Sequence, residues 1–212
     1  MQRFPPLYAI LDPQFSSMPL TELARQLAHA GVQLMQLRDK GSSARALYSQ
    51  TIDLLAALAP SGARLIVNDR SDIAAMAGAA GVHVGQEDLR VEDARKVCGS
   101  SRWVGVSTHN LEQLRAADGT SADYIAVGPI FPTGAKANPD PVVGVEFVRM
   151  AREITRKPIV AIGGITLESA ADVFRAGADS VAVIRDLSLS KYPEPRAREY
   201  IAIADRNRIA RD

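Results

Sequence analysis

Cysteine is nearly absent from this chain of 212 residues, which contains Cys98 alone. A single cysteine excludes an intrachain disulfide and a cysteine-ligated metal cluster. Cys98 ends an apolar-periodic stretch, Val91–Cys98, and this position favours a buried, inert thiol. Aromatic residues make up only 5% of the chain, and we expect Trp103 and Phe147 to serve in packing.

An excess of charge of either sign is also missing. The 25 lysines and arginines nearly balance the 24 aspartates and glutamates, which leaves a formal net charge of +1. This balance excludes a general attraction to nucleic acid or to an anionic membrane. No apolar run approaches the ~20 residues that span a bilayer, and the first residues lack the hydrophobic region of a signal peptide. We therefore expect a cytoplasmic protein with no nucleic-acid or membrane partner.

Short apolar runs, which are typical of buried parallel strands, recur along the chain. They are Leu7–Leu11, Leu34–Leu37, Leu65–Val67, Val82–Val84, Trp103–Val106, Tyr124–Val127, Ile159–Ile162 and Val181–Ile184. Helical periodicity fills most intervals, and it predicts helices at Thr21–Ala30, Ala44–Leu58, Val145–Ile154 and Leu167–Ala176. For the last of these helices we expect Thr166 as N-cap and Gly177 just beyond the C-cap.

Alternating strands and helices predict a parallel sheet with right-handed crossovers. Eight such units suit an α/β protein with the (β/α)8 TIM-barrel fold, whose usual length is about 250 residues. An open doubly wound sheet is the alternative, but Leu11-Asp12-Pro13-Gln14 is not the glycine-rich turn that would favour it. Because no linker or second core interrupts the pattern, we predict one barrel domain over residues 1–212.

The stretch Leu65–Asp88 indicates a metal site. It contains one strand–helix–strand unit, in which Asp69 follows the first strand and Asp88 the second. Neighbouring strands lie about 4.8 Å apart, so the two carboxylates could converge on one hard cation. Mg²⁺ commonly takes one or two carboxylates and completes its shell with water and phosphate oxygens.

Polar side chains gather at the other strand ends too, where barrel enzymes carry their chemistry. In chain order they are Gln36, Arg38, Lys40, Asn68, Gln86, Ser107, His109, Thr133, Lys136 and Arg185. Any one of them alone could be a solvated loop residue. Together with the two carboxylates they predict a pocket for a Mg²⁺-bound pyrophosphate, because arginine and lysine neutralise the oxygens that the metal leaves free.

Three further features have two interpretations each. Gly163-Gly164-Ile165-Thr166 suits a phosphate at a helix N-terminus, or a tight turn that needs glycine for steric reasons alone. The proline- and glycine-rich loop Pro129–Gly144 is functional or disordered, and on a barrel it would overhang the active-site face. His83 lies inside an apolar strand, where a satisfied core histidine is more common than a ligand.

At these residues the sequence strongly resembles the thiamine phosphate synthase family. The shared motifs are Gln36-Leu37-Arg38-Asp39-Lys40, Asn68-Asp69-Arg70, Gly81-Val82-His83-Val84-Gly85-Gln86-Glu87-Asp88, Gly105-Val106-Ser107-Thr108-His109, Gly128-Pro129-Ile130-Phe131-Pro132-Thr133 with Lys136, and Ala161-Ile162-Gly163-Gly164-Ile165. They occur in order from the second strand to the seventh and cover nearly the whole chain. No single motif is specific, but the set is.

The resemblance implies a TIM barrel that joins 4-amino-2-methyl-5-hydroxymethylpyrimidine diphosphate to 4-methyl-5-(2-phosphoethyl)thiazole, carboxylated or not, and releases pyrophosphate. It implies Mg²⁺ at Asp69 and Asp88, and ionisation of the C–O bond before the thiazole nitrogen attacks. The pyrimidine diphosphate is expected at Gln36, Leu37, Arg38, Asp39, Lys40, Asn68, Ser107 and Lys136, and the thiazole phosphate at Thr133, Gly164, Ile184 and Arg185. The catalytic side chains expected are Arg38, Lys40, Ser107 and Lys136.

Two positions depart from the family pattern, and both belong to the expected thiazole-phosphate side. Ala135 stands where the family usually has a second loop threonine, and Arg185 where it usually has serine. The arginine could offset the lost hydroxyl because it pairs bidentately with phosphate, or the second substrate could differ. A surface pairing of Arg185 with Asp186 is the structural alternative.

Two other functions remain possible for such a barrel. A related thiazole tautomerase would use His109 for proton transfer, and a regulatory barrel would bind a phosphorylated ligand without catalysis. The retained set of Arg38, Lys40, Asp69, Asp88 and Lys136 favours the synthase over both. A homodimer is expected only from barrel enzymes in general.

Overall fold

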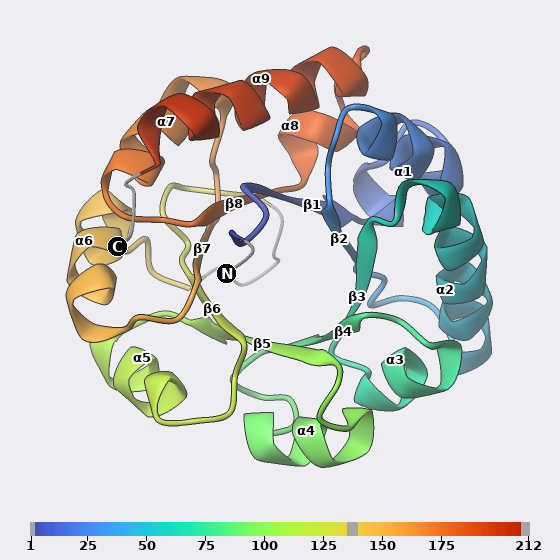
Figure 1. Cartoon of the computed structure of the whole chain (residues 1–212), viewed down its shortest axis with the longest axis horizontal. Helices are drawn as coiled ribbons and strands as arrows, with labels where there is room; N and C mark the ends of the chain where they lie inside the picture. Colours follow the sequence, from blue (N-terminus) through green and yellow to red (C-terminus); the bar gives the residue numbers. More distant parts are fainter. Residues whose placement is uncertain (1–2, 135–139, 209–212) are drawn as a thin grey trace.

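The computed structural model describes residues 3–134 and 140–208. Within them, eight parallel strands close into a barrel in sequential order, and β8 pairs with β1 (Figure 1). The strands are β1 (Leu7–Leu11), β2 (Leu34–Leu37), β3 (Arg64–Asn68), β4 (Gly81–Val84), β5 (Trp103–Thr108), β6 (Tyr124–Val127), β7 (Ile159–Ile162) and β8 (Ser180–Val183). The predicted (β/α)8 fold is confirmed, with strand ends shifted by at most two residues.

Helices form an outer ring around this barrel (Figure 1). They are α1 (Leu20–His29), α2 (Ala44–Leu58), α3 (Ser71–Ala77), α4 (Val91–Cys98), α5 (Leu111–Asp118), α6 (Gly144–Ile154), α7 (Leu167–Arg175), α8 (Arg185–Ser188) and α9 (Pro193–Asn207), with short 3-10 turns η1 (Pro13–Phe15) and η2 (Ala59–Ser61). The predicted bounds of α2 are confirmed; α1 is shifted by one residue at both ends, and α6 and α7 differ from prediction by one residue at one end. None of the described helices is long and apolar enough to cross a membrane.

Local capping explains where α7 begins and ends. Thr166 is the N-cap, and its backbone N–H donates to the Ser169 hydroxyl at 3.0 Å, which forms a capping box. Gly177 follows the C-cap with φ of 111°, a conformation that favours glycine. Both predicted caps are confirmed.

Strand alternation divides the core into two parts. The larger part lies between strands and helices and contains Phe147 and Cys98, both nearly inaccessible to solvent. The expected burial of Cys98 is confirmed, and this burial raises the pKa of its thiol. The smaller part fills the barrel interior with Tyr8, Ile10, Leu34, Ile66, Tyr124, Ala126, Val160 and Ala182.

The segment before β1 closes one end of the barrel interior. The Phe4 ring stacks on Trp103, with centroids 5.4 Å apart, and also contacts Tyr124. The Arg64 guanidinium covers the tryptophan at 4.5 Å from the ring centroid. The packing role predicted for Trp103 is therefore confirmed, and the opposite end of the barrel is left for a cavity.

Candidate active site

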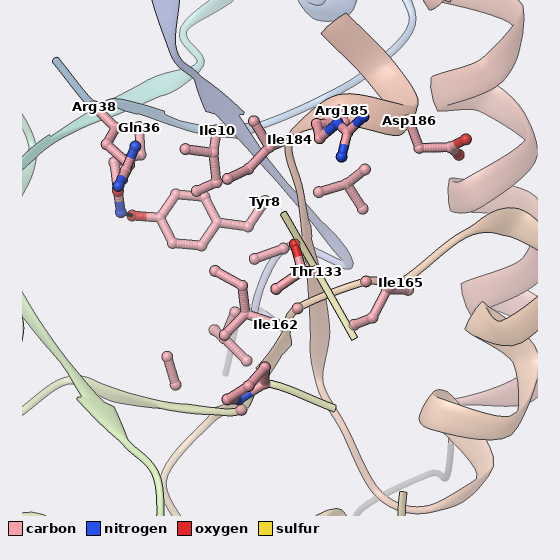
Figure 2. A pocket seen from close by; sticks show the side chains of 18 of the residues that line it. Tyr8, Ile10, Gln36, Arg38, Thr133, Ile162, Ile165, Ile184, Arg185 and Asp186 are labelled. Carbon is pink, nitrogen blue, oxygen red and sulfur yellow. Dashed lines mark hydrogen bonds between the residues drawn. The ribbon is translucent and has the colours of Figure 1, made fainter. Parts of the chain in front are cut away.

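A cavity of about 630 Å³ opens at the carboxyl ends of the strands (Figure 2). Its wall includes these residues that the sequence predicted for the site: Gln36, Arg38, Asn68, Ser107, Thr133, Gly164, Ile184 and Arg185. They come from strand ends that are up to 149 positions apart in the chain, 36 to 185, and the closed barrel brings them together. The predicted concentration of polar groups on this face is what the structure shows.

The cavity has polar groups on two sides and an apolar surface between them. Gln36 and Arg38 lie on one side, and Arg185 lies on the other, beyond Ile184 (Figure 2). The apolar surface is formed by Ile10, Ala126, Val160, Ile162 and Ala182. Such a division suits ring-shaped ligands whose charged ends point in opposite directions.

Arg38 is held by an acidic residue that the sequence analysis did not single out. Its guanidinium forms an ion pair with the carboxylate of Asp12, which is only 1% exposed. The same carboxylate accepts a hydrogen bond from the Gln14 N–H at 3.0 Å and so caps η1. Asp12 therefore fixes the direction in which Arg38 enters the cavity. Its position directly after β1, a strand end like the others, was the available signal.

The two predicted metal ligands lie close together beside this wall. The Asp69 carboxylate is 3.3 Å from the Lys40 ammonium, and the Asp88 carboxylate accepts a hydrogen bond from the Gly85 N–H at 2.7 Å. Partial burial raises the pKa of Asp69, and the neighbouring Asp88 carboxylate raises it further, while Lys40 acts in the opposite direction. The protein thus brings together two carboxylates that repel each other.

This donor set fits a magnesium ion. A divalent cation would relieve the repulsion between Asp69 and Asp88, and two carboxylates are a usual protein contribution to an Mg²⁺ shell. Within residues 3–134 and 140–208 the structure shows no cluster of three or more histidine, cysteine or acidic side chains suited to a metal. The remaining ligands would therefore be water and phosphate oxygens.

Two predicted residues, Leu37 and Asp39, have side chains directed away from the cavity. Leu37 is fully buried in the core between strands and helices, so its side chain faces away from the cavity. The Asp39 carboxylate accepts hydrogen bonds from Gly41, Ser42 and Gln50 and organises the turn after β2; these bonds lower its pKa against the opposing effect of burial. Lys136 lies outside the described residues, as does part of the loop predicted to overhang the site.

The glycine turn after β7 has a clear steric reason. Gly164 has φ of 63°, and a Cβ there would lie 2.5 Å from the Pro132 carbonyl oxygen and 2.8 Å from Phe131 Cβ. The loop after β6 therefore packs directly against this turn, which supports the steric interpretation of the glycines. Because Gly164 also lines the cavity, the structure leaves room for the anion-binding interpretation.

The suggested surface pair between Arg185 and Asp186 is not formed among the described residues. Asp186 instead accepts hydrogen bonds from Arg196, at 2.8 and 3.1 Å, and from the Tyr200 hydroxyl. The two side chains point apart (Figure 2), and the Arg185 guanidinium lies 5.9 Å from the Phe15 ring centroid. The alternative fails because α8 starts at Arg185 and turns Asp186 toward α9.

Both histidines of the cavity wall are hydrogen-bonded. His83 contacts the Ser107 hydroxyl at 2.9 Å and the Tyr124 hydroxyl at 3.1 Å, which confirms it as a satisfied, buried histidine. It also reaches the cavity surface, a role that the sequence analysis missed. His109 donates through Nδ1 to the Gly128 carbonyl at 2.6 Å, and its Nε2 lies 3.5 Å from the Asp140 carboxylate.

Fold and cavity together define a (β/α)8-barrel enzyme for small molecules. Comparisons with known proteins specify which one. The family described as "Thiamine monophosphate synthase" matches residues 7–187. A thiamine-phosphate synthase from Koribacter versatilis is 50% identical over 206 residues, which cover 95% of this chain and 96% of the relative. Another from Shouchella clausii is 41% identical over 182 residues, or 85% of this chain and 87% of the relative.

A solved structure agrees with these matches. The thiamine phosphate pyrophosphorylase from Pyrococcus furiosus superposes with a TM-score of 0.87 and is 30% identical, with 95% of this chain and 96% of that chain covered. The chain therefore belongs to the thiamine monophosphate synthase family. It is a transferase of thiamine biosynthesis, as the resemblance implied.

Proposed function

We propose that the two polar sides of the cavity divide the two substrates of thiamine phosphate synthesis between them. The pyrimidine diphosphate would lie along β2 to β5, with its diphosphate toward Arg38 and Lys40. The thiazole phosphate would lie along β7 and β8, with its phosphate toward Gly164 and Arg185. The observation that carries this assignment is the apolar surface between two separated sets of cationic or N–H donor groups.

The reaction begins when the C–O bond between the pyrimidine methylene and the diphosphate breaks and its electron pair leaves with the diphosphate. Arg38 and Lys40 hold the leaving group and reduce its charge, which is the electrostatic stabilisation that such a step needs. Mg²⁺ bound at Asp69 and Asp88 would supply further charge neutralisation for pyrophosphate.

The second step joins the two rings. The methylene cation, stabilised by the electron-rich aminopyrimidine, is captured by the lone pair of the thiazole nitrogen, and a C–N bond forms. Because that nitrogen carries no proton, the step needs no general base. The apolar surface around Ile162 and Val160 keeps water away from the cation, which would otherwise be hydrolysed.

The tautomerase alternative receives little support from His109. Its Nδ1 donates to the Gly128 carbonyl and its Nε2 lies 3.5 Å from the Asp140 carboxylate, so protein groups hold the ring in place. Incubating the protein with both substrates and measuring pyrophosphate release tests the proposal. Stoichiometric release with thiamine phosphate supports it, whereas isomerisation of a thiazole carboxylate without pyrophosphate contradicts it.

Two expectations about the protein as a whole stay predictions. A cytoplasmic location is one of them. The other is a homodimer, which multi-angle light scattering would measure. Whether the thiazole carries a carboxylate is decided by comparing kcat/KM for the two forms.

A further inference from the structure

Beneath the cavity, hydrogen bonds connect five strands, β1, β2, β4, β5 and β6, through side chains that face the barrel interior. The Gln36 amide nitrogen donates to the Tyr8 hydroxyl at 2.7 Å, and the Tyr8 and Tyr124 hydroxyls are 3.0 Å apart. Tyr124 in turn contacts His83 Nδ1 at 3.1 Å, and His83 Nε2 contacts the Ser107 hydroxyl at 2.9 Å. Gln36 and Ser107, at the two ends, line the cavity.

The inner members of this chain are buried, although Tyr8 and His83 also touch the cavity. Tyr8 is 1% exposed and Tyr124 is fully buried, and the Tyr124 ring stacks on His83 with centroids 5.5 Å apart. The ring fits inside the barrel only because β5 has a glycine beside it: a Cβ at Gly105 would lie 2.0 Å from the Tyr124 ring. Burial raises the pKa of both tyrosines well above the usual value, so each hydroxyl keeps its proton.

One ordering of these hydrogen bonds lets every hydroxyl both accept and donate. In it, the Tyr8 oxygen accepts from the Gln36 amide and gives its proton to Tyr124, and Tyr124 gives its proton to His83 Nδ1. A neutral histidine that accepts at Nδ1 carries its proton at Nε2, so His83 donates to Ser107. The Ser107 proton is then left for a ligand acceptor, and the Gln36 amide oxygen for a ligand donor.

We propose that Tyr8, Tyr124 and His83 are positioning residues that fix Ser107 as a donor and the Gln36 oxygen as an acceptor toward the pyrimidine. This inference rests on the proposed function, because it concerns the pyrimidine half of that site. A 4-aminopyrimidine offers an amino donor next to a ring-nitrogen acceptor and matches this polarity. A 4-oxo pyrimidine offers a carbonyl acceptor next to a ring N–H and would require all the bonds to reverse. The chain of bonds therefore selects amino over oxo pyrimidines.

The first measurement is the protonation of His83 in the whole protein without ligand. Ring ¹⁵N chemical shifts distinguish a protonated from an unprotonated nitrogen, and H83Q identifies the signals among the 3 histidines of the chain. We expect a proton on Nε2 and none on Nδ1. In Tyr124→Phe, Nδ1 loses its donor, and we expect a mixture of the two tautomers. A wild-type protein with its proton on Nδ1 would overturn the proposed direction.

The second measurement is the binding of 4-amino-2-methyl-5-hydroxymethylpyrimidine diphosphate and of its 4-oxo counterpart, with the thiazole left out. We expect the wild type to bind the amino compound roughly tenfold to a hundredfold more tightly than the oxo compound. This is the usual effect on affinity when one buried polar group is left without a hydrogen-bond partner, as the oxo compound would leave it. Tyr124→Phe and Tyr8→Phe should each lose most of this preference. If both variants keep the wild-type preference, the buried tyrosines do not set the donor and acceptor roles of Ser107 and Gln36, and the proposal is refuted.

Thr108→Val is the matched control, because the buried Thr108 hydroxyl donates to the Ala126 carbonyl at 3.0 Å on the outer side of the same strand as Ser107. The Thr108→Val protein should be less stable than the wild type. It should keep the wild-type tautomer of His83 and the preference for the 4-amino over the 4-oxo pyrimidine. If Tyr124→Phe does not fold, Tyr8→Phe carries the same test. If neither pyrimidine binds while the tautomer is as expected, the proposed function fails but the direction of the bonds stands.

Discussion

The Lys40 ammonium lies 3.3 Å from the Asp69 carboxylate, at the ends of the neighbouring strands β2 and β3. Asp69 is held here in a left-handed conformation, with φ of 61°, which is uncommon for residues other than glycine, asparagine and aspartate. One lysine does not cancel the effect of burial and of Asp88, since the pKa of Asp69 remains raised. The apoprotein therefore carries a destabilising charge where a cation is expected to bind.

Asp69→Asn should make the metal-free protein more stable at neutral pH while slowing synthesis. The folded-state pKa of Asp69 lies above its unfolded value, so the wild type loses stability as the pH rises from about 4 through the folded-state pKa. Asparagine removes that charge and tolerates the same φ. Thermal unfolding in EDTA at pH 7 and at pH 4 measures the effect, which should disappear at the lower pH.

The same variant separates metal binding from folding. Mg²⁺ should raise the melting temperature of the wild type but not that of Asp69→Asn, and kcat should fall by at least about a hundredfold because charge on the leaving group goes unneutralised. Wild-type activity of Asp69→Asn in excess EDTA would contradict the assignment of this residue to magnesium.

Asp12→Asn should weaken both the barrel and the pyrimidine-diphosphate site. The variant keeps the side-chain size but leaves the Arg38 guanidinium without its buried partner, and breaking such a pair costs about 3–5 kcal/mol. Urea denaturation measures the loss, and KM for the pyrimidine diphosphate should rise. In the double variant with Arg38→Gln, the stability losses should be far from additive. Additive losses would mean that the two residues act independently.

Arg185→Ser should raise KM for the thiazole phosphate by roughly tenfold to a hundredfold, because a charge-assisted hydrogen bond typically contributes about 1.5–3 kcal/mol. KM for the pyrimidine diphosphate should barely change. Arg175→Ser is the control, since that arginine is exposed on α7 and pairs with Asp172. Equal weakening of both substrates would show that Arg185 is not a dedicated phosphate ligand.

Gly164→Ala should destabilise the protein more than Gly62→Ala. Both residues have positive φ, 63° and 69°, so each alanine costs about 1–2 kcal/mol in backbone strain. Only at Gly164 does the new Cβ also collide with Pro132 and Phe131, whereas nothing lies within 4 Å at Gly62. We expect an additional cost of about 1–3 kcal/mol. Equal unfolding free energies would show that the loop after β6 moves away easily.

The architecture and the motifs at the strand ends could be predicted from the sequence alone. Apolar runs alternate with helical periodicity, and this local pattern predicts a parallel sheet whose strands lie where the runs are. Eight such units, with no glycine-rich turn after the first strand, favoured the barrel over an open doubly wound sheet. Polar residues directly after those runs, such as Arg38 and Asn68, reach the cavity because the carboxyl ends of parallel strands share one face.

Which side chains within the strands meet inside the barrel depends on the closed fold and could not be predicted from the sequence. Tyr8 and Tyr124 are 116 positions apart in sequence, and each looks like an ordinary apolar strand residue until the barrel closes and brings their hydroxyls together. In the same way, the pairing of Asp12 with Arg38 and of Asp186 with Arg196 depends on which strand or helix lies adjacent. Local periodicity specifies the face of a strand, but the partner across that face is set by register and closure, which no short stretch of sequence contains.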